Sequence, residues 1–215
     1  MDRRSFILDA SAAAAFAAAG CSDRQSEATK GKQQKEGNGM DFKELIEARR
    51  SVRQYAKADI SAGDMEAIVA DALNAPSWRN SETTRYYAAI GEDAKKKMCD
   101  ALPAFNVANS ANASALVAVT YVPGESGFRD GTPTDDLGNT WGAYDCGLAS
   151  SYFILAAKNR GWDTLIMGMR DVAKVKAVFG IPESQILMAV IAVGKAAQPP
   201  VKVPRKPVSE VLKTA

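Results

Sequence analysis

Apolar residues recur at helical spacing in two segments that open the globular part of the chain. Asp41 and Glu44 are placed as a capping pair for a first helix, which we expect to end near residue 49. Ser61 and Asp64 are placed to begin a second helix, which the Asn-Ala-Pro run at residues 74–76 ends. Both segments are therefore predicted to be helices with one apolar face, made of Phe42, Leu45 and Ile46 in the first and of Met65, Ile68, Val69, Ala72 and Leu73 in the second.

Short runs of apolar and β-branched residues, bounded by Gly or Pro, predict β-strands. They cover residues 85–90, 115–122, 163–166 and 186–193, so we expect a sheet of at least four strands. Large apolar side chains also recur at helical spacing from residue 138 to residue 160, which predicts a long helix that packs centrally or at a subunit interface. The tail from Ala196 is rich in Pro, Lys and Val, which favours an extended arm over a helix.

Residues 1–21 have the pattern of a targeting segment. Arg3 and Arg4 form a basic start, an Ala-rich apolar run follows, and small residues precede Cys21. The pattern resembles a bacterial lipoprotein signal with Cys21 as the lipidated residue, and its Arg-Arg-Ser-Phe-Ile run also resembles a twin-arginine export motif; the alternative is an ordinary N-terminal helix. Residues 22–39 contain almost nothing apolar and predict a flexible tether to a domain at residues 40–215. We therefore expect an exported protein of the bacterial cell envelope, held at a membrane by its lipid anchor only.

The composition restricts the possible functions. The 215 residues, 47% hydrophobic and 24% charged, match one globular domain with a tail. A formal net charge of +2 and the lack of a basic stripe interleaved with aromatics argue against nucleic acid as a partner. Because the chain has no histidine, Ser-His-Asp and Cys-His nucleophiles and imidazole metal ligands are excluded. Cys99 and Cys146 lack the spacing of a metal site and are expected to be separate buried thiols, with a disulfide as the alternative.

Two clusters near the predicted helices could bind a ligand. Arg-Arg-Ser-Val-Arg at residues 49–53 brings three guanidinium groups and a hydroxyl to a helix end, which suits a phosphate. The alternative is a solvated charged turn. The loop at residues 75–82 combines a helix stop, Trp78 and short hydrogen-bonding side chains, so it could either read the edge of a flat heterocycle or form a structural turn.

Two further clusters lie later in the chain. Met-Gly-Met at residues 167–169 follows a predicted strand directly, where a glycine lets the backbone approach a ligand closely. An ordinary turn at the strand end is the alternative. The tail at residues 202–206 carries three cations and could equally be a solubilising, mobile terminus.

In this order the clusters resemble the nitroreductase family. The resemblance rests on Arg-Arg-Ser-Val-Arg-Gln-Tyr at residues 49–55, Ala-Pro-Ser-Trp-Arg-Asn-Ser at 75–81, Gly-Ala-Tyr-Asp-Cys-Gly-Leu-Ala at 142–149, Arg-Gly-Trp-Asp-Thr at 160–164 and Arg-Lys-Pro-Val-Ser-Glu-Val-Leu at 205–212. It covers nearly everything from Met40 onward. It implies an α+β fold with a mixed central sheet flanked by helices, and an intertwined homodimer with one FMN at each of two interface sites.

The same resemblance implies roles for individual residues. The flavin phosphate and the polar edge of the ring would be held by Arg49, Arg50, Ser51 and Arg53, joined by Arg205 from the tail, with Lys206 as a weaker candidate. The other subunit would contribute Pro76, Ser77, Trp78 and Asn80. Glu82 stands where the family often has Gln, which is a departure from its pattern. The reactive nitrogen of the ring would be lined by Met167, Gly168 and Met169, with backbone amides as donors.

The implied activity is transfer of hydride from NADH or NADPH through flavin N5 to a nitroaromatic, a quinone or a similar small electrophile. No catalytic side chain is assigned, because cationic groups and backbone donors stabilise the reduced flavin and water supplies protons. One alternative keeps the fold and takes an enone, a free flavin or a halogenated aromatic as acceptor. The other is an exported lipoprotein that binds a small ligand or a partner without catalysis.

Overall fold

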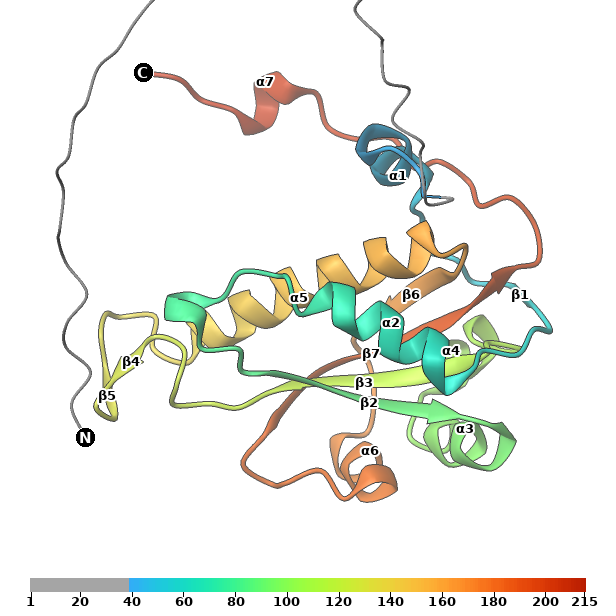
Figure 1. Cartoon of the computed structure of the whole chain (residues 1–215), viewed down its shortest axis with the longest axis horizontal. Helices are drawn as coiled ribbons and strands as arrows, with labels where there is room; N and C mark the ends of the chain where they lie inside the picture. Colours follow the sequence, from blue (N-terminus) through green and yellow to red (C-terminus); the bar gives the residue numbers. More distant parts are fainter. Residues whose placement is uncertain (1–38) are drawn as a thin grey trace, which may run out of the picture. The chain divides into compact units, whose positions relative to one another are not determined.

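The structure is a computed structural model that describes residues 39–215. The predicted targeting segment with Cys21, and the tether up to residue 38, lie outside the described residues. In chain order (Figure 1) the elements are α1 (Phe42–Ala48), β1 (Tyr55–Ala56), α2 (Ala62–Ala72), a 3₁₀ turn (Trp78–Asn80), β2 (Thr84–Ile90), α3 (Glu92–Cys99), α4 (Ala104–Asn109), β3 (Ala115–Tyr121), β4 (Phe128–Arg129), β5 (Thr132–Pro133), α5 (Thr140–Asn159), β6 (Asp163–Met167), α6 (Val172–Phe179), β7 (Ile186–Ala196) and α7 (Val208–Val211). Within the described part, no helix has both the length and the apolar character needed to cross a bilayer.

The long strand β7 organises the sheet. It pairs antiparallel with β3, β6 and β1, and β3 in turn pairs antiparallel with β2. A parallel bridge between Ser51 and Thr164 joins the chain after α1 to β6. The predicted mixed sheet is therefore confirmed, although the named strands of the described part all pair antiparallel. β4 and β5 form a separate hairpin.

The sheet has a hydrophobic core on each of its faces. Successive side chains of a strand point to opposite faces, and β3 follows this rule: Val117 and Val119 belong to one buried cluster, whereas Leu116 and Ala118 belong to the other. In Figure 1, α2 and α5 lie over the first face, and α3 and α6 lie over the second. This arrangement is the predicted α+β fold of a sheet flanked by helices.

The elements with strong local signals form where they are predicted. Asp41 caps α1 by accepting a hydrogen bond from the Glu44 backbone N–H, and Ser61 and Asp64 form a reciprocal capping box at the start of α2. The four predicted strands are β2, β3, β6 and β7, and the predicted long helix is α5. The helices α3, α4 and α6 and the two-residue strand β1 are additional to the prediction.

Two predictions need correction. No residue of α1 is buried, although the helix was predicted to have an apolar face, and the side chains of Phe42 and Ile46 are 72% and 44% exposed. The tail is not extended throughout, because α7 forms one short helical turn. Pro207 precedes this turn with a φ of −65°, a value that suits the residue before a first helical turn.

The thiols of Cys99 and Cys146 are both free, as predicted. Cys146 belongs to α5 and is buried, whereas Cys99 at the end of α3 is only half-buried. Burial raises the pKa of the Cys146 thiol to about 11, and burial also raises the pKa of Cys99, aided by the nearby Asp100 carboxylate. Neither thiol therefore has the lowered pKa of a reactive cysteine.

Candidate active site

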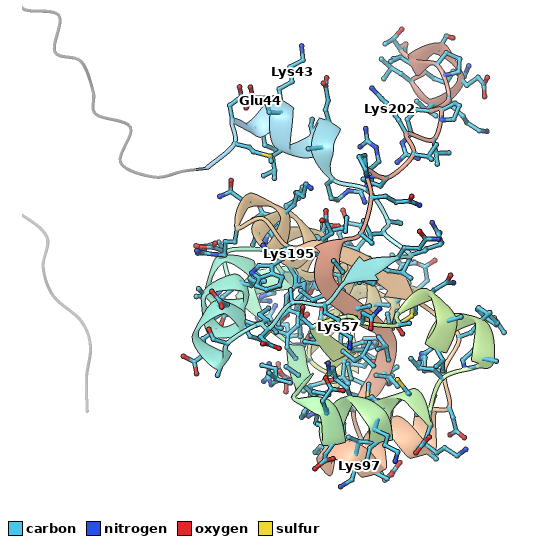
Figure 2. The ribbon with its side chains drawn as sticks, turned by 90° about the vertical axis from the view of Figure 1, so that its right-hand side faces the viewer. Lys43, Glu44, Lys57, Lys97, Lys195 and Lys202 are labelled. Atoms are coloured by element: carbon cyan, nitrogen blue, oxygen red, sulfur yellow. The ribbon has the colours of Figure 1, made fainter. Side chains whose placement is uncertain are left out.

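A cavity of about 360 Å³ lies between two segments that are far apart in the sequence. One segment, residues 49–54, follows α1, and the other, residues 198–205, follows β7. Figures 1 and 2 both show the chain after α1 beside the tail, which carries Lys202. The predicted binding residues that line this arginine cavity are Arg49, Arg50, Ser51, Arg53 and Arg205.

The first wall of the arginine cavity is fixed by an extended backbone. Arg49 ends α1 with extended φ and ψ, and the Val52 N–H then donates to the Thr164 carbonyl of β6 over 3.0 Å. Val52 is buried in the core, so alternation along the extended chain leaves Ser51 and Arg53 exposed on the opposite side. The anchored valine thus positions the hydroxyl and guanidinium groups on its two sides.

The second wall is held against the first by β1. Tyr55 pairs with Ala196 at the end of β7, and the Ala197 N–H donates to the Gln54 carbonyl over 2.9 Å. The Gln198 Nε2 then donates to the Gln54 Oε1 over 2.7 Å. These two glutamines line the cavity and were missed by the sequence analysis. Little in the sequence marks them as cavity residues: Gln54 follows the arginine motif, and Gln198 precedes a pair of prolines.

The arginine cavity is strongly cationic. No acidic side chain of the described chain lines it, and none of its four arginines belongs to an ion pair within residues 39–215. Burial lowers the pKa of Arg49, and the neighbouring charges of Arg205 and Arg50 lower it further. Like charges held together without a counterion favour the binding of an anion.

The loop at residues 75–82 forms a different site. Pro76, Ser77 and Glu82 line a small cavity of about 30 Å³ that shares no residue with the arginine cavity. The Ser77 Oγ accepts from the Glu82 N–H over 3.0 Å, and the Asn80 Nδ2 donates to the Glu82 Oε1 over 2.7 Å. The Trp78 ring lies 5.5 Å from the Arg79 guanidinium carbon. Glu82 thus stabilises the loop through hydrogen bonds to Ser77 and Asn80.

A buried carboxylate on α5 anchors this loop. The Trp78 N–H donates to Asp145 Oδ2 over 2.9 Å, and the Ser126 hydroxyl donates to the same oxygen over 2.6 Å. No role for Asp145 is predicted from the sequence. The sequence could have marked Asp145, because an acidic residue among small residues on the buried face of a helix needs hydrogen-bond partners nearby.

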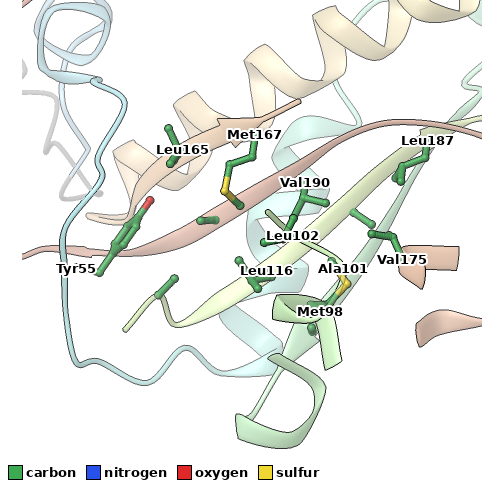
Figure 3. Packing of buried hydrophobic residues seen from close by; sticks show 14 of the residues in the cluster. Tyr55, Met98, Ala101, Leu102, Leu116, Leu165, Met167, Val175, Leu187 and Val190 are labelled. Atoms are coloured by element: carbon green, nitrogen blue, oxygen red, sulfur yellow. The ribbon is translucent and has the colours of Figure 1, made fainter. Parts of the chain in front are cut away.

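The Met-Gly-Met segment lies at the end of β6. Met167 is buried, and its side chain points into the core with Leu165 (Figure 3), so only its backbone could contact a ligand. Gly168 and Met169 line an open cavity beside the α3–α4 turn, away from the arginine cavity. The Asn106 Nδ2, which the sequence analysis did not single out, donates to the Met169 carbonyl over 2.8 Å.

Comparison with known proteins identifies the family. The profile of the nitroreductase family matches residues 46–195. The chain belongs to the nitroreductase family. A protein of Archaeoglobus fulgidus, whose name marks its assignment as NADH dehydrogenase/NAD(P)H nitroreductase as provisional, is 29% identical over 154 residues, which cover 70% of this chain and 82% of that protein. The CLA biosynthesis enone reductase of Lactiplantibacillus plantarum is 25% identical over 198 residues, covering 77% of this chain and 90% of the relative.

Solved structures show the same fold. A nitroreductase-type protein of Exiguobacterium sibiricum, also named provisionally, was solved in complex with FMN and matches with a TM-score of 0.71 and 21% identity, over 82% of this chain and 98% of that one. The enone reductase CLA-ER matches with a TM-score of 0.72 and 21% identity, over 81% of this chain and 97% of that one. The nitroreductase fold that the sequence predicts is therefore confirmed.

A single chain brings together only part of the predicted site. The arginine cavity contains the predicted residues from 49–53 together with Arg205, whereas the 75–82 loop and the 167–169 segment each lie elsewhere. Lys206 does not line the arginine cavity and lies 3.6 Å from Glu210 in an exposed pair. No group of three or more acidic or cysteine side chains in residues 39–215 could hold a metal ion.

Proposed function

We propose that this chain is an FMN-dependent oxidoreductase that transfers hydride from NADH or NADPH to a small electrophile such as a nitroaromatic or a quinone. The observation that carries the proposal is the arginine cavity, in which guanidinium groups from two distant segments face one space without a counterion. The relatives support the choice of cofactor and reductant, since one structure of this fold contains FMN and one relative is named as an NAD(P)H nitroreductase.

The residues present fit an FMN phosphate. Arginine has a planar fork of donors that matches phosphate oxygens, and Ser51 adds a hydroxyl beside it. Burial lowers the pKa of Arg49 most, and a dianionic phosphate would relieve the additional lowering by the charges of Arg205 and Arg50. We assign phosphate binding to Arg49, Arg50, Ser51, Arg53 and Arg205.

The ring of the flavin would lie along β6. Ser51 pairs with Thr164 near the start of this strand, and Gly168 follows its last residue. A Cβ atom added at Gly168 would meet no atom within 4 Å, so the space beside this backbone is open. The Gly168 amide donates to no carbonyl among the loop and turn hydrogen bonds of the described residues, so we infer that it would donate to the ring. The neighbouring Met169 side chain is exposed beside it.

The site is completed by a second copy of the chain. Pro76, Ser77, Trp78 and Asn80 line no part of the arginine cavity in one chain, and we propose that they close the flavin site of the partner in a homodimer. Exposed apolar side chains supply a surface for such an interface, because α1 buries none of its residues and the tail exposes Val203, Val208, Val211 and Leu212.

Bound flavin supplies hydride acceptance and donation at N5, and the chain contributes binding and electrostatics. The arginines would hold the phosphate, the Gly168 amide would favour negative charge on the ring, and the 75–82 loop would limit access of water. The chain has no histidine, and water can supply the proton to the reduced acceptor.

The absorption spectrum of the purified protein tests this function. We expect a yellow protein with bound FMN that bleaches when NADH or NADPH is added under argon. Adding nitroaromatic, quinone and enone acceptors in turn then identifies the substrate class by reoxidation rate. Charge reversal, Arg49→Glu or Arg53→Glu, should abolish flavin retention. A colourless protein that cannot be reconstituted with FMN contradicts the proposal.

We further propose that the enzyme is exported and anchored by lipid at Cys21, with residues 22–39 as a tether. The basic start, apolar run and small residues before the cysteine support this. Twin-arginine export carries folded proteins, which suits an enzyme that acquires FMN before export. Mass spectrometry of the mature protein should find lipid on Cys21, and Cys21→Ser should release the protein from membranes. An unmodified N-terminus that begins at Met1 would exclude the anchor.

A further inference from the structure

The side chain of Asp145 is a buried carboxyl group whose only hydrogen-bond partners in the described chain come from two loops. Its exposed fraction is 3%, and it has no ion pair within residues 39–215. A single oxygen, Oδ2, accepts from the Trp78 N–H over 2.9 Å and from the Ser126 hydroxyl over 2.6 Å. Burying a carboxylate without a cation is costly, so these donors must hold it firmly. The carboxylate therefore acts as a fixed point between α5 and the two loops.

The loop that Asp145 holds has a strained backbone. Arg79, Asn80 and Glu82 have φ values of 49°, 57° and 49°, in the left-handed region that residues other than glycine rarely adopt. Such conformations persist only where surrounding contacts impose them, and they concentrate at ligand-binding sites. Within the loop, Ser77 and Glu82 supply contacts of their own. The Asp145 bond ties the start of this strained turn to α5.

We propose that Asp145 is a positioning residue for flavin binding across the subunit interface. By fixing the Trp78 N–H, it keeps the 75–82 loop in the shape that presents Ser77 and Asn80 to the flavin of the partner subunit. Through Ser126, the same oxygen links this loop to the segment between β3 and β4. The inference rests on the proposed function for the identity of the ligand, whereas the ordering of the loop is independent of it.

The critical feature is a hydrogen-bond acceptor at the position of Oδ2. Asparagine keeps a carbonyl oxygen there, so Asp145→Asn can still accept from both donors. Alanine removes the acceptor and leaves the Trp78 N–H unpaired. Glutamate keeps the charge but displaces the carboxylate by one methylene group, for which the adjoining cavity of about 30 Å³ offers space.

The experiment compares FMN binding and loop dynamics in full-length variants. Free FMN is titrated into apoprotein to obtain its dissociation constant, and amide hydrogen exchange is followed by mass spectrometry on peptides that cover residues 77–82. For Asp145→Ala we expect a dissociation constant raised by about tenfold or more, the effect of losing one charge-assisted hydrogen bond, with faster exchange in the loop. Asp145→Asn should restore both values to within about threefold of the wild type.

Ser126→Ala is the matched control, because it removes the second donor and leaves the Trp78 bond in place. Its FMN affinity and loop exchange should stay close to wild type. If Asp145→Ala fails to fold, Asp145→Glu replaces it, with weaker FMN binding and faster loop exchange expected.

Two results would overturn the inference: unchanged FMN affinity in Asp145→Ala, or weakened affinity with unchanged loop exchange. A wild-type protein that binds no FMN refutes the proposed function instead, and the exchange data then still decide whether Asp145 orders the loop.

Discussion

At the scale of single residues, Arg49 shows that the guanidinium groups of the arginine cavity repel one another. Burial and the charges of Arg205 and Arg50 together lower its pKa, so the guanidinium groups are held close without an anion. The proposed phosphate would convert this repulsion into affinity. The unliganded protein and the FMN complex should therefore respond in opposite ways to the loss of one cation.

The first prediction concerns Arg205→Ala. We expect the FMN dissociation constant to rise by about tenfold to a hundredfold, since a charge-assisted contact to phosphate is lost. The free energy of unfolding of the apoprotein should not decrease, because Arg205 is exposed and repels Arg49. Lys206→Ala is the control, since Lys206 contacts only the exposed Glu210 in this region. Equal effects of the two substitutions on FMN affinity would refute the assignment.

The second prediction follows from the buried thiol of Cys146, whose pKa burial raises to about 11. A thiol in the unfolded chain ionises near pH 8.5, so the folded state disfavours the thiolate. The contribution of the protonated thiol to the free energy of unfolding is fully present below about pH 8.5, and it is lost as the pH rises toward 11. Denaturant unfolding under reducing conditions should show that the free energy of unfolding falls by an amount on the order of 2 kcal/mol more in the wild type than in Cys146→Ala. Parallel pH profiles would contradict this.

At the scale of elements, the contact between α5 and β3 depends on a missing side chain. A Cβ atom at Gly142 would lie 2.6 Å from two ring carbons of Tyr121, which is itself buried on β3. The helix can therefore cross this strand closely only because residue 142 is glycine. Gly147 lies five residues further along the helix and is exposed, and a Cβ atom added there would have no atom within 4 Å.

The third prediction uses these two glycines as a matched pair. Gly142→Ala should lower the free energy of unfolding by about 1–3 kcal/mol, because overpacking outweighs the better helix propensity of alanine. Gly147→Ala should raise it by up to about 1 kcal/mol through propensity alone. Thermal and urea unfolding of both apoproteins measure the difference. A stabilised Gly142→Ala variant would show that α5 does not pack as described.

At the scale of the whole molecule, the first helix and the tail of the described chain are incompletely packed. α1 buries none of its residues, and every residue from Val201 to Ala215 is exposed. The residues directly after α1 and the first residues of the tail line the arginine cavity. In the proposed dimer these surfaces would be covered, so assembly and flavin binding should depend on the same stretch of chain.

The fourth prediction is that a protein lacking residues 199–215 still folds but loses dimerisation and FMN binding. The truncated protein should keep its helical circular dichroism, because none of the removed residues belongs to the buried core. It should become a monomer in light scattering after size exclusion and lose FMN affinity by more than about a hundredfold, since Arg205 and the interface are removed together. A truncated dimer that retains FMN would exclude a binding role for the tail.

The amino-acid sequence by itself determined the features that depend on neighbouring residues. Capping pairs at Asp41 and Ser61, and short apolar or β-branched runs bounded by Gly or Pro, are local features of the chain, so the corresponding helices and strands could be predicted. The family motifs could be recognised for the same reason. α3 was missed because its Glu- and Lys-rich sequence has few apolar positions, and β1 was missed because its two residues are stabilised only by pairing with β7.

Only the tertiary structure decided which of the candidate residues meet. Arg205 reaches the arginines after α1 because β1 pairs with the end of β7, a contact across more than half the chain that no local pattern encodes. Strand alternation turned the Met167 side chain into the core, and packing of α5 brought Asp145 under the Trp78 loop. Local spacing selects elements, whereas the burial of apolar faces on both sides of one sheet selects which distant residues become neighbours.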